Sequence, residues 1–260
     1  MRRRLPLPIL IAAVIGGAFV VLPVAALVTR APWGRFGDVL GGEGARAALR
    51  LSLEVSLAAT VLSVALGVPL AWVLARREFR GHALLRAMVV LPIVLPPVVA
   101  GVALLEALGR QGVVGGWLDR ALGIQLTFST GGAIVAATFV SMPLVVLAAE
   151  AGFRGLDRRF EQAAGVLGAS PSYTLRRVVL PMTAPQLAAG AVLAWARALG
   201  EFGATITFAG NLQGRTQTVP LAVFQQLQTD RDGAVALSLV LVLVSIAVLV
   251  ALRGRILGAR

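Results

Sequence analysis

The sequence predicts an all-α integral membrane protein with six transmembrane helices. Its 260 residues are 58% hydrophobic and 14% charged, whereas a soluble domain carries about 25% charged residues. The mean hydropathy is +0.86. Six apolar stretches approach or exceed the roughly 20 residues that a membrane-spanning helix needs. These observations argue against a water-soluble enzyme.

The six apolar stretches follow one another along a single transmembrane domain, residues 1–260. The first is longer than the roughly 7–15 apolar residues of a cleavable signal peptide, so we interpret it as a retained span. No linker between the stretches indicates a second domain. We expect the spans at residues 9–29, 51–75, 84–108, 130–149, 184–209 and 234–252.

The distribution of arginine predicts the orientation of these spans. All 24 basic residues are arginine, and the formal net charge is +12. With the N-terminus inside, 15 arginines, among them Arg2, Arg3, Arg4 and Arg260, fall in inner segments and 8 in outer segments. Because cytoplasmic loops are enriched in basic residues, both termini are expected in the cytoplasm. Topology and membrane lipid then account for the basic excess, so we expect no nucleic-acid partner.

Residue types exclude most kinds of catalytic centre. The chain has no cysteine and a single histidine, His82, which excludes thiol catalysis, iron–sulfur clusters and a multi-histidine metal site. An intramembrane protease would need a nucleophile–base pair or metal ligands at membrane depth. We therefore expect no enzyme, no catalytic residue, no metal and no cofactor in this chain.

The longest polar stretch, the 152–183 loop, contains signals for two short helices. The first, about residues 158–167, is followed by Gly168, a residue type favoured just after a helix C-terminus. The second begins with Ser170 as N-cap and Pro171 at its first position. We expect it to end before Pro181, because proline removes a backbone hydrogen bond from a helix.

Small residues in the 152–183 loop would let a bulky partner approach closely: Ala163, Ala164 and Gly168. Considered from physics alone, the loop fits an amphipathic segment on anionic lipid headgroups as well as it fits a docking element for another protein.

The fifth span contains an unusual pair of charges. Arg197 and Glu201 are four residues apart, so a helix places them within pairing distance. A charge at mid-membrane costs about 2.5–3.5 kcal/mol on insertion scales, so both side chains should face protein or a watery cavity. Two interpretations stay open: a buried ion pair that fixes helix packing, or part of a gate or translocation path.

Other residues of the third and fifth spans also suggest a path. Gly200 and Gly203 suit close helix packing, and neutral donors could contact a passing oxyanion weakly, as a conducting path requires. These donors are Thr205, Thr207 and Asn211. In the third span, Pro92, Pro96 and Pro97 should bend or unwind the helix, either as a pathway wall or as a simple kink.

The 152–183 loop resembles the EAA loop of permease subunits in bacterial ABC importers. The shared pattern is Ala163-Ala164, three residues, Gly168, nine residues, Val178, one residue, and Leu180-Pro181. The family's glutamate position is Gln162 here, with Glu161 just before it. The resemblance implies an ABC importer permease fold and a helix that inserts into a separate cytoplasmic ATPase. The chain has no G-x-x-x-x-G-K-[ST] motif, so that partner would bind ATP and Mg²⁺.

Three further segments are similar to the molybdate branch of these permeases: LPIVLPPVVAG (91–101), ARALGEFGATITFAGN (196–211) and GRTQTVPLAVFQ (214–225). The resemblance implies ATP-driven import of molybdate, or tungstate, across the bacterial cytoplasmic (inner) membrane. It also implies a homodimer, two copies of the ATPase and an external oxyanion-binding protein. Sulfate permeases share the G-E-[FY]-G core, so sulfate or thiosulfate import is the alternative. A stand-alone ion-coupled carrier using Arg197 and Glu201, with Glu54 and Glu106 as further candidates, is the alternative from another class.

Overall fold

The computed structural model describes residues 6–256, and all regular secondary structure in that range is helical. Arg2, Arg3, Arg4 and Arg260, which entered the orientation argument, lie outside the described residues. The helices, in chain order, are α1 (Leu7–Thr29), a 3₁₀ turn (Trp33–Arg35), α2 (Phe36–Gly41), α3 (Glu43–Arg76), α4 (His82–Val94), α5 (Pro97–Leu108), α6 (Gly115–Leu122), α7 (Thr130–Gly155), α8 (Arg159–Val166), α9 (Pro171–Thr174), a π-helical segment (Leu175–Val179), α10 (Leu180–Leu199), α11 (Gly203–Phe208), α12 (Val219–Thr229) and α13 (Arg231–Ile256).

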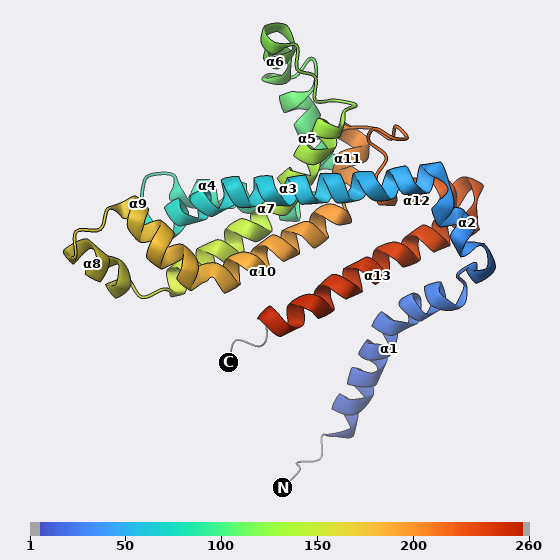
Figure 1. The fold of residues 1–260 in the computed structure, drawn as a ribbon, viewed down its shortest axis with the longest axis horizontal. Coiled ribbons are helices and arrows are strands. Elements are labelled where there is room, and N and C mark those ends of the chain that lie inside the picture. The colour runs from blue at the N-terminus through green and yellow to red at the C-terminus, as the bar shows by residue number, and fades with distance from the viewer. Residues whose placement is uncertain (1–5, 257–260) are drawn as a thin grey trace.

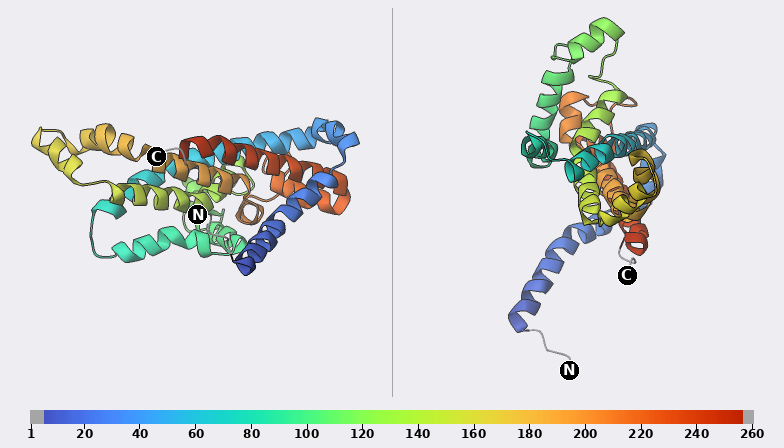
Figure 2. Two further views of the ribbon diagram at one scale, coloured as in Figure 1. Left: turned by 90° about the horizontal axis from the view of Figure 1, so that it is seen from below. Right: turned by 90° about the vertical axis from the view of Figure 1, so that its left-hand side faces the viewer.

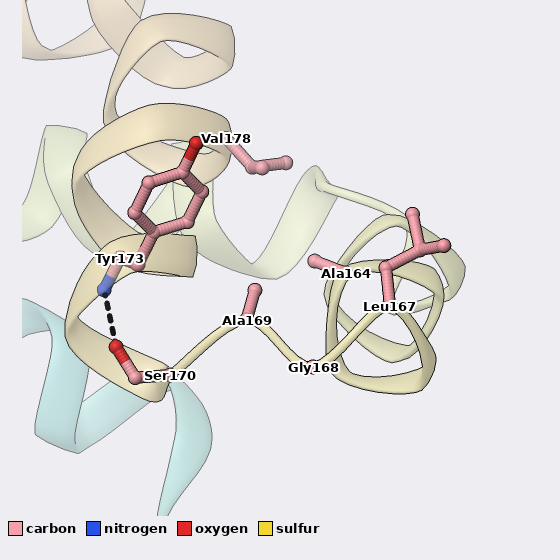
Figure 3. Close-up of a pocket in the computed structure, with 7 residues that line it drawn as sticks. All are labelled: Ala164, Leu167, Gly168, Ala169, Ser170, Tyr173 and Val178. Carbon is pink, nitrogen blue, oxygen red and sulfur yellow. Dashed lines mark hydrogen bonds between the residues drawn. The ribbon is translucent and has the colours of Figure 1, made fainter.

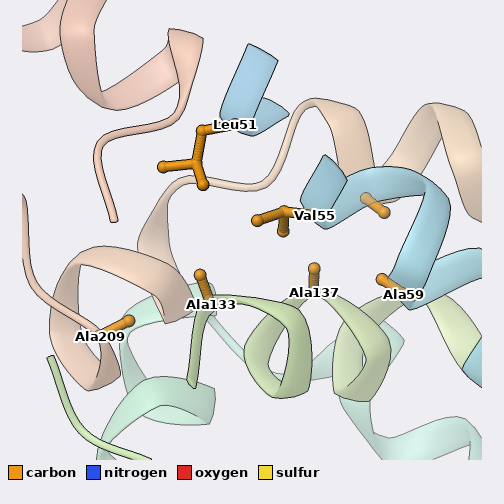
Figure 4. Packing of buried hydrophobic residues seen from close by; sticks show 7 residues of the cluster. Leu51, Val55, Ala59, Ala133, Ala137 and Ala209 are labelled. Carbon is orange, nitrogen blue, oxygen red and sulfur yellow. The ribbon is translucent and has the colours of Figure 1, made fainter. Parts of the chain in front are cut away.

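The centre of the molecule is a bundle of α3, α7 and α10, which lie side by side (Figure 1). Small residues line the contact between α3 and α7: Ala59, Ala133 and Ala137 are fully buried beside Val55 (Figure 4). Such side chains let two helix backbones approach closely, which is the main source of attraction between helices in lipid. The bundle therefore forms a close-packed core to which the other segments attach.

Within residues 6–256, five helices are long and apolar enough to cross a membrane: α1, α3, α7, the continuous helix 171–199, and α13. The stretch expected as the third span is instead two shorter apolar helices, α4 and α5. Leu95 and Pro96 between them are extended, with ψ of 135° and 134°. This break is the unwinding predicted from the prolines. After it, α5 packs against α7 and α11, and α6 projects away from the bundle (Figure 1).

The fifth span is also interrupted. α10 ends at Leu199, and after a three-residue break the short helix α11 packs against α5 and α7. The chain then forms an irregular segment, with Gly210 at φ 77°, before α12 begins. Both broken spans meet on one side of the bundle, because α11 contacts α5.

The expected helix end before Pro181 is wrong. The helix that starts at Pro171 continues through Pro181 to Leu199 as one 29-residue unit, with a π-helical segment at Leu175–Val179. In a π-turn the hydrogen bonds run from i to i−5, so the carbonyl four residues before the proline is displaced from the ring that would otherwise clash with it. The helix therefore absorbs Pro181 without ending.

The long axis of the molecule separates two ends (Figure 2). One end carries α8 and α9, and the other carries α2 and the C-terminal end of α12. α1 leans away from the bundle, and none of its residues is buried. An apolar helix exposed over its whole circumference suits a lipid environment rather than water.

Candidate functional site

The middle of the 152–183 loop forms a helix–turn–helix knob, defined here as residues 158–174. Gly168 has a φ of 81°, a left-handed conformation that glycine adopts without strain. The Ser170 hydroxyl accepts a hydrogen bond from the Tyr173 N–H at 3.3 Å and so caps α9 (Figure 3). The expected turn and cap are thus confirmed, and they fix the angle between α8 and α9.

The knob exposes large apolar side chains. Val166 and Leu167 are 88% and 87% exposed, and Phe160 and Tyr173 are about half exposed. A hollow of about 650 Å³ lies between the two short helices (Figure 3), lined by Ala164, Leu167, Gly168, Ala169, Ser170, Tyr173 and Val178. Apolar tips on a loop of otherwise polar character are typical of a surface that a partner covers.

Glu161 and Gln162, the two candidates for the family's glutamate position, have different surroundings. Glu161 forms an ion pair with Arg76, the last residue of α3, so its carboxylate ties the knob to the bundle. Gln162 is exposed, and it is therefore the side chain free to face a partner. Ala163 is exposed as well, whereas Leu180 packs beside Val179 in the bundle's core. The Leu180-Pro181 portion of the motif thus lies in the long helix rather than in the knob.

At the break between α10 and α11, Glu201 is 2% exposed, and its carboxylate accepts two hydrogen bonds. Its Oε2 accepts a hydrogen bond from Arg197 Nη1 at 2.6 Å, and its Oε1 accepts one from the Ala204 N–H at 2.7 Å. The predicted pairing is confirmed. The second contact was not foreseen: the carboxylate also holds the first turn of α11, so one side chain bridges the break between α10 and α11.

The glycines near the break allow α11 to lie against α5. A Cβ atom added at Gly203 would lie 2.5 Å from Pro97 Cβ, and one added at Gly101 would lie 2.5 Å from Thr207 Cβ. The structure thus brings together Pro97, Gly203 and Thr207 from the two interrupted spans. Gly101 was not among the expected site residues, although it stands four residues after Pro97 and so shares its helix face.

Of the three expected hydrogen-bond donors, Thr205 is buried, and Thr207 and Asn211 form hydrogen bonds within the chain. Thr205 is 1% exposed, and the Thr207 hydroxyl donates to the Gly203 carbonyl at 2.8 Å. Asn211 donates to Gln225 Oε1 at 3.5 Å, and the same oxygen accepts a hydrogen bond from Gln217. Sequence reasoning missed Gln217 and Gln225. The signal available for them was an amide-rich run that follows the break.

The two candidate sites lie at different places along one helix. The helix 171–199 runs from the knob to the break, and at 1.5 Å per residue its 29 residues span about 40 Å. The sites are therefore not one pocket. The helix 171–199 joins them, with the knob at its N-terminal end and the Arg197–Glu201 pair at its C-terminal end.

The family model for the binding-protein-dependent transport system inner membrane component matches residues 67–260. The chain belongs to this family. The matched region contains the knob and both interrupted spans, so the features built above lie in the part of the chain shared with the family. The interpretation of the chain as an importer permease and membrane subunit, rather than an enzyme, is confirmed.

Individual relatives are similar over most of the chain. The molybdenum transport system permease protein ModB of Mycobacterium tuberculosis is 46% identical, over 96% of this chain and 95% of its own length. The sulfate transport system permease protein CysT of Salmonella typhimurium is 35% identical, over 80% of this chain and 76% of its own.

A solved structure supports the importer-permease fold. It is described as a bacterial alginate ABC transporter in complex with an alginate pentasaccharide-bound periplasmic protein. It matches with a TM-score of 0.75 at 15% identity, over 96% of this chain and 93% of that one. The all-helical importer-permease fold is thus confirmed, while the exact number of spans and the homodimer stay predictions.

Proposed function

We propose that this chain is the permease subunit of an ATP-driven importer of molybdate, with tungstate as a second substrate. The observation that carries the proposal is the 46% identity to a molybdenum permease over 96% of the chain. That match includes the broken spans and the knob. Sulfate is the runner-up substrate, supported by the lower and shorter match to the sulfate permease.

The physics of the substrate favours an energy-driven system. Moving one charge against the membrane potential costs about 2.3 kcal/mol per 100 mV, so a divalent oxyanion entering a cell that is negative inside faces about 4.6 kcal/mol. A passive channel would let the anion leave the cell. Because the chain lacks a phosphate-binding loop, we propose that two copies of a cytoplasmic ATPase supply the energy, with ATP and Mg²⁺ bound there.

The geometry suggests how the coupling would work. The knob presents Gln162 and the apolar tips Val166 and Leu167 to the ATPase. Closure of two ATPase subunits around ATP would displace the knob, and the continuous helix 171–199 would carry that displacement to the Glu201 bridge. The break would then change the relative position of α11 and α5, which line the proposed path.

We also propose a homodimer in the bacterial inner membrane, with both termini in the cytoplasm and an external oxyanion-binding protein. The exposed circumference of α1 is consistent with contacts to lipid or to a second copy. The periplasmic protein in the alginate transporter of similar fold supports the same kind of partner here. The path would lie between the two copies.

Uptake of labelled molybdate at trace concentration tests the substrate. The permease is expressed with its ATPase and binding protein in cells that lack high-affinity uptake, and excess tungstate or sulfate is added. We expect uptake that depends on the chain, is blocked by tungstate and ignores sulfate. Strong sulfate competition would assign the chain to sulfate instead. Uptake that persists without the ATPase would favour the ion-coupled carrier.

Gly168→Arg tests the docking of the knob. Gly168 has a positive φ and lies in the hollow of the knob, so arginine there should both strain the turn and fill the docking surface. We expect loss of ATPase copurification and of uptake. Gly37→Arg is the control, because Gly37 has open space around it at the opposite end. If Gly168→Arg retains the ATPase and transport, the docking proposal is wrong.

A further inference from the structure

A basic pocket lies beside the knob and takes no part in the proposed path. Its volume is about 620 Å³, and it is formed by the end of α3, the turn into α4 and the region from the end of α7 to the start of the knob. Four arginines line it, namely Arg76, Arg77, Arg154 and Arg158, against one carboxylate, Glu78. Arg76 and Arg154 are each paired with a glutamate outside this lining, Glu161 and Glu150, so the excess positive charge of the pocket comes from Arg77 and Arg158 against Glu78.

Two of the arginines are fixed by the protein. The side chain of Arg76 is 10% exposed, its guanidinium lies 5.2 Å from the centre of the Trp72 ring, and its buried Nε has no hydrogen-bond partner. Arg154 is held by Glu150 at 2.7 Å and reaches the Leu74 carbonyl at 3.4 Å. These two guanidinium groups are thus held in place as the floor of the pocket, and Glu161 and Glu150 balance their charges.

The other two arginines are available for a ligand. Arg77 and Arg158 are exposed, and neither forms an ion pair with any residue that the structure describes. Arginine presents several N–H groups in a planar fork that matches the oxygens of a phosphate group. A pocket with two fixed and two adjustable guanidinium groups suits an anion of that chemistry.

Aromatic and apolar residues place the pocket at the edge of the lipid-facing region. Phe79, which lines the pocket, is 42% exposed, and Val73 near the end of α3 is 40% exposed, whereas Trp72 packs edge-on against the buried Phe153. Tryptophan and other aromatic side chains gather where acyl chains meet lipid headgroups. A free phosphate ion would gain nothing from the exposed Phe79 ring, whereas a lipid could place its acyl chains along the exposed apolar side chains of α3.

We propose that this pocket binds the phosphate of an anionic phospholipid headgroup, with Arg77 and Arg158 closing over the phosphate oxygens. Basic pockets between membrane helices recognise headgroups in this way. The site is separate from the translocation path, and it also joins α3, α7 and the start of the knob through one ligand. A bound lipid would therefore hold the knob to the bundle, in addition to the Arg76–Glu161 pair.

Native mass spectrometry of the purified permease–ATPase complex tests the proposal. The complex is titrated with short-chain phosphatidylglycerol, and in parallel with phosphatidylcholine. Each arginine near the membrane surface contributes about 1 kcal/mol to the binding of an anionic lipid. The double substitution Arg77→Gln and Arg158→Gln should therefore weaken phosphatidylglycerol binding about 30-fold. Arg120→Gln with Arg215→Gln removes the same charge elsewhere and should change nothing. Arg77→Lys with Arg158→Lys should restore part of the binding.

Each other outcome contradicts the proposal. Equal retention of the two lipids, or equal binding by the glutamine variants and the control, would mean that the pocket is no lipid site. Displacement of phosphatidylglycerol by millimolar inorganic phosphate would assign the pocket to a free anion. If the complex binds no phosphatidylglycerol, the proposal is wrong. The mass of each complex reports whether the ATPase is still attached.

Discussion

Replacing Gly203 with alanine should separate the packing of α11 on α5 from all other roles of this segment. The new Cβ would lie 2.5 Å from Pro97 Cβ and 3.2 Å from the Pro97 carbonyl carbon, whereas carbon atoms pack best about 3.5–4.0 Å apart. α11 must therefore retreat by about 1 Å, and overpacking of this kind costs about 1–3 kcal/mol. Pro97 cannot move aside easily, because its ring is part of the backbone at the start of α5.

Gly200→Ala is the matched control for this change. Gly200 begins the break that Gly203 follows, but its added Cβ would find only the Ala196 carbonyl oxygen, at 3.7 Å. Its φ of −89° also suits alanine. The substitution should therefore be neutral, or should stabilise the fold by about 0.4–1 kcal/mol through the unfolded chain. Both variants lose the same backbone freedom, so only the contact with Pro97 distinguishes them.

Thermal unfolding of the purified complex, followed by size-exclusion chromatography, measures the difference. A gap of about 2 kcal/mol between the variants corresponds to a midpoint roughly 4–8 °C lower for Gly203→Ala than for Gly200→Ala. Molybdate uptake should fall with Gly203→Ala and persist with Gly200→Ala. If the two variants unfold at the same temperature, α11 does not pack on α5 as described, and the reasoning fails.

Three further predictions concern other parts of the chain. Glu201→Gln leaves the partly buried Arg197 without its counter-ion and should destabilise the fold by about 1.5–3 kcal/mol. An unfolding midpoint equal to that of the wild type would mean that Glu201 does not hold α10 and α11 together. Pro96→Ala combined with Pro97→Ala should let α4 and α5 join and reduce uptake while assembly persists; unchanged uptake would leave a simple kink. The Asp119 carboxylate accepts hydrogen bonds from the Gln125 amide and the Arg110 guanidinium, and these bonds, that of Gln125 most, lower the pKa of the carboxyl. The ionised carboxylate therefore stabilises α6 above the ordinary aspartate pKa of about 3.9. This stabilisation is lost as the pH falls through the lowered pKa. Hydrogen-exchange protection of residues 110–125 should drop there, and Asp119→Asn should remove the pH dependence.

Features that depend on neighbouring residues could be predicted from the sequence. Gly168, Ser170 and Pro171 specify the turn and cap of the knob through their own backbone preferences. Pro96-Pro97 specifies the break between α4 and α5 in the same way, and the Arg197–Glu201 pair follows from helical spacing. Each of these signals lies within a few residues of the structure it determines.

Features that depend on tertiary packing could not be predicted in this way. The π-helical segment at Leu175–Val179 ends at Val179, which is buried against α3 and α7, and no local pattern indicates this segment. The pair of Arg76 and Glu161 joins residues 85 positions apart, and no local pattern indicates it. Thr207 was expected to face a path because it is polar, but a hydroxyl in a membrane helix can instead bond the carbonyl one turn earlier. The role of such residues is set by what packs around them.

The π-helical segment also determines the direction in which the knob points. A π-turn is an α-helix with one additional residue, and each residue of an α-helix turns the chain by about 100°. Removing one residue from 175–179 would rotate Tyr173, Val166 and Leu167 by about that angle around the axis of α10. The number of residues between Pro171 and Leu180 therefore sets the side of the α10 axis on which the knob lies, and so the direction from which a partner would bind it.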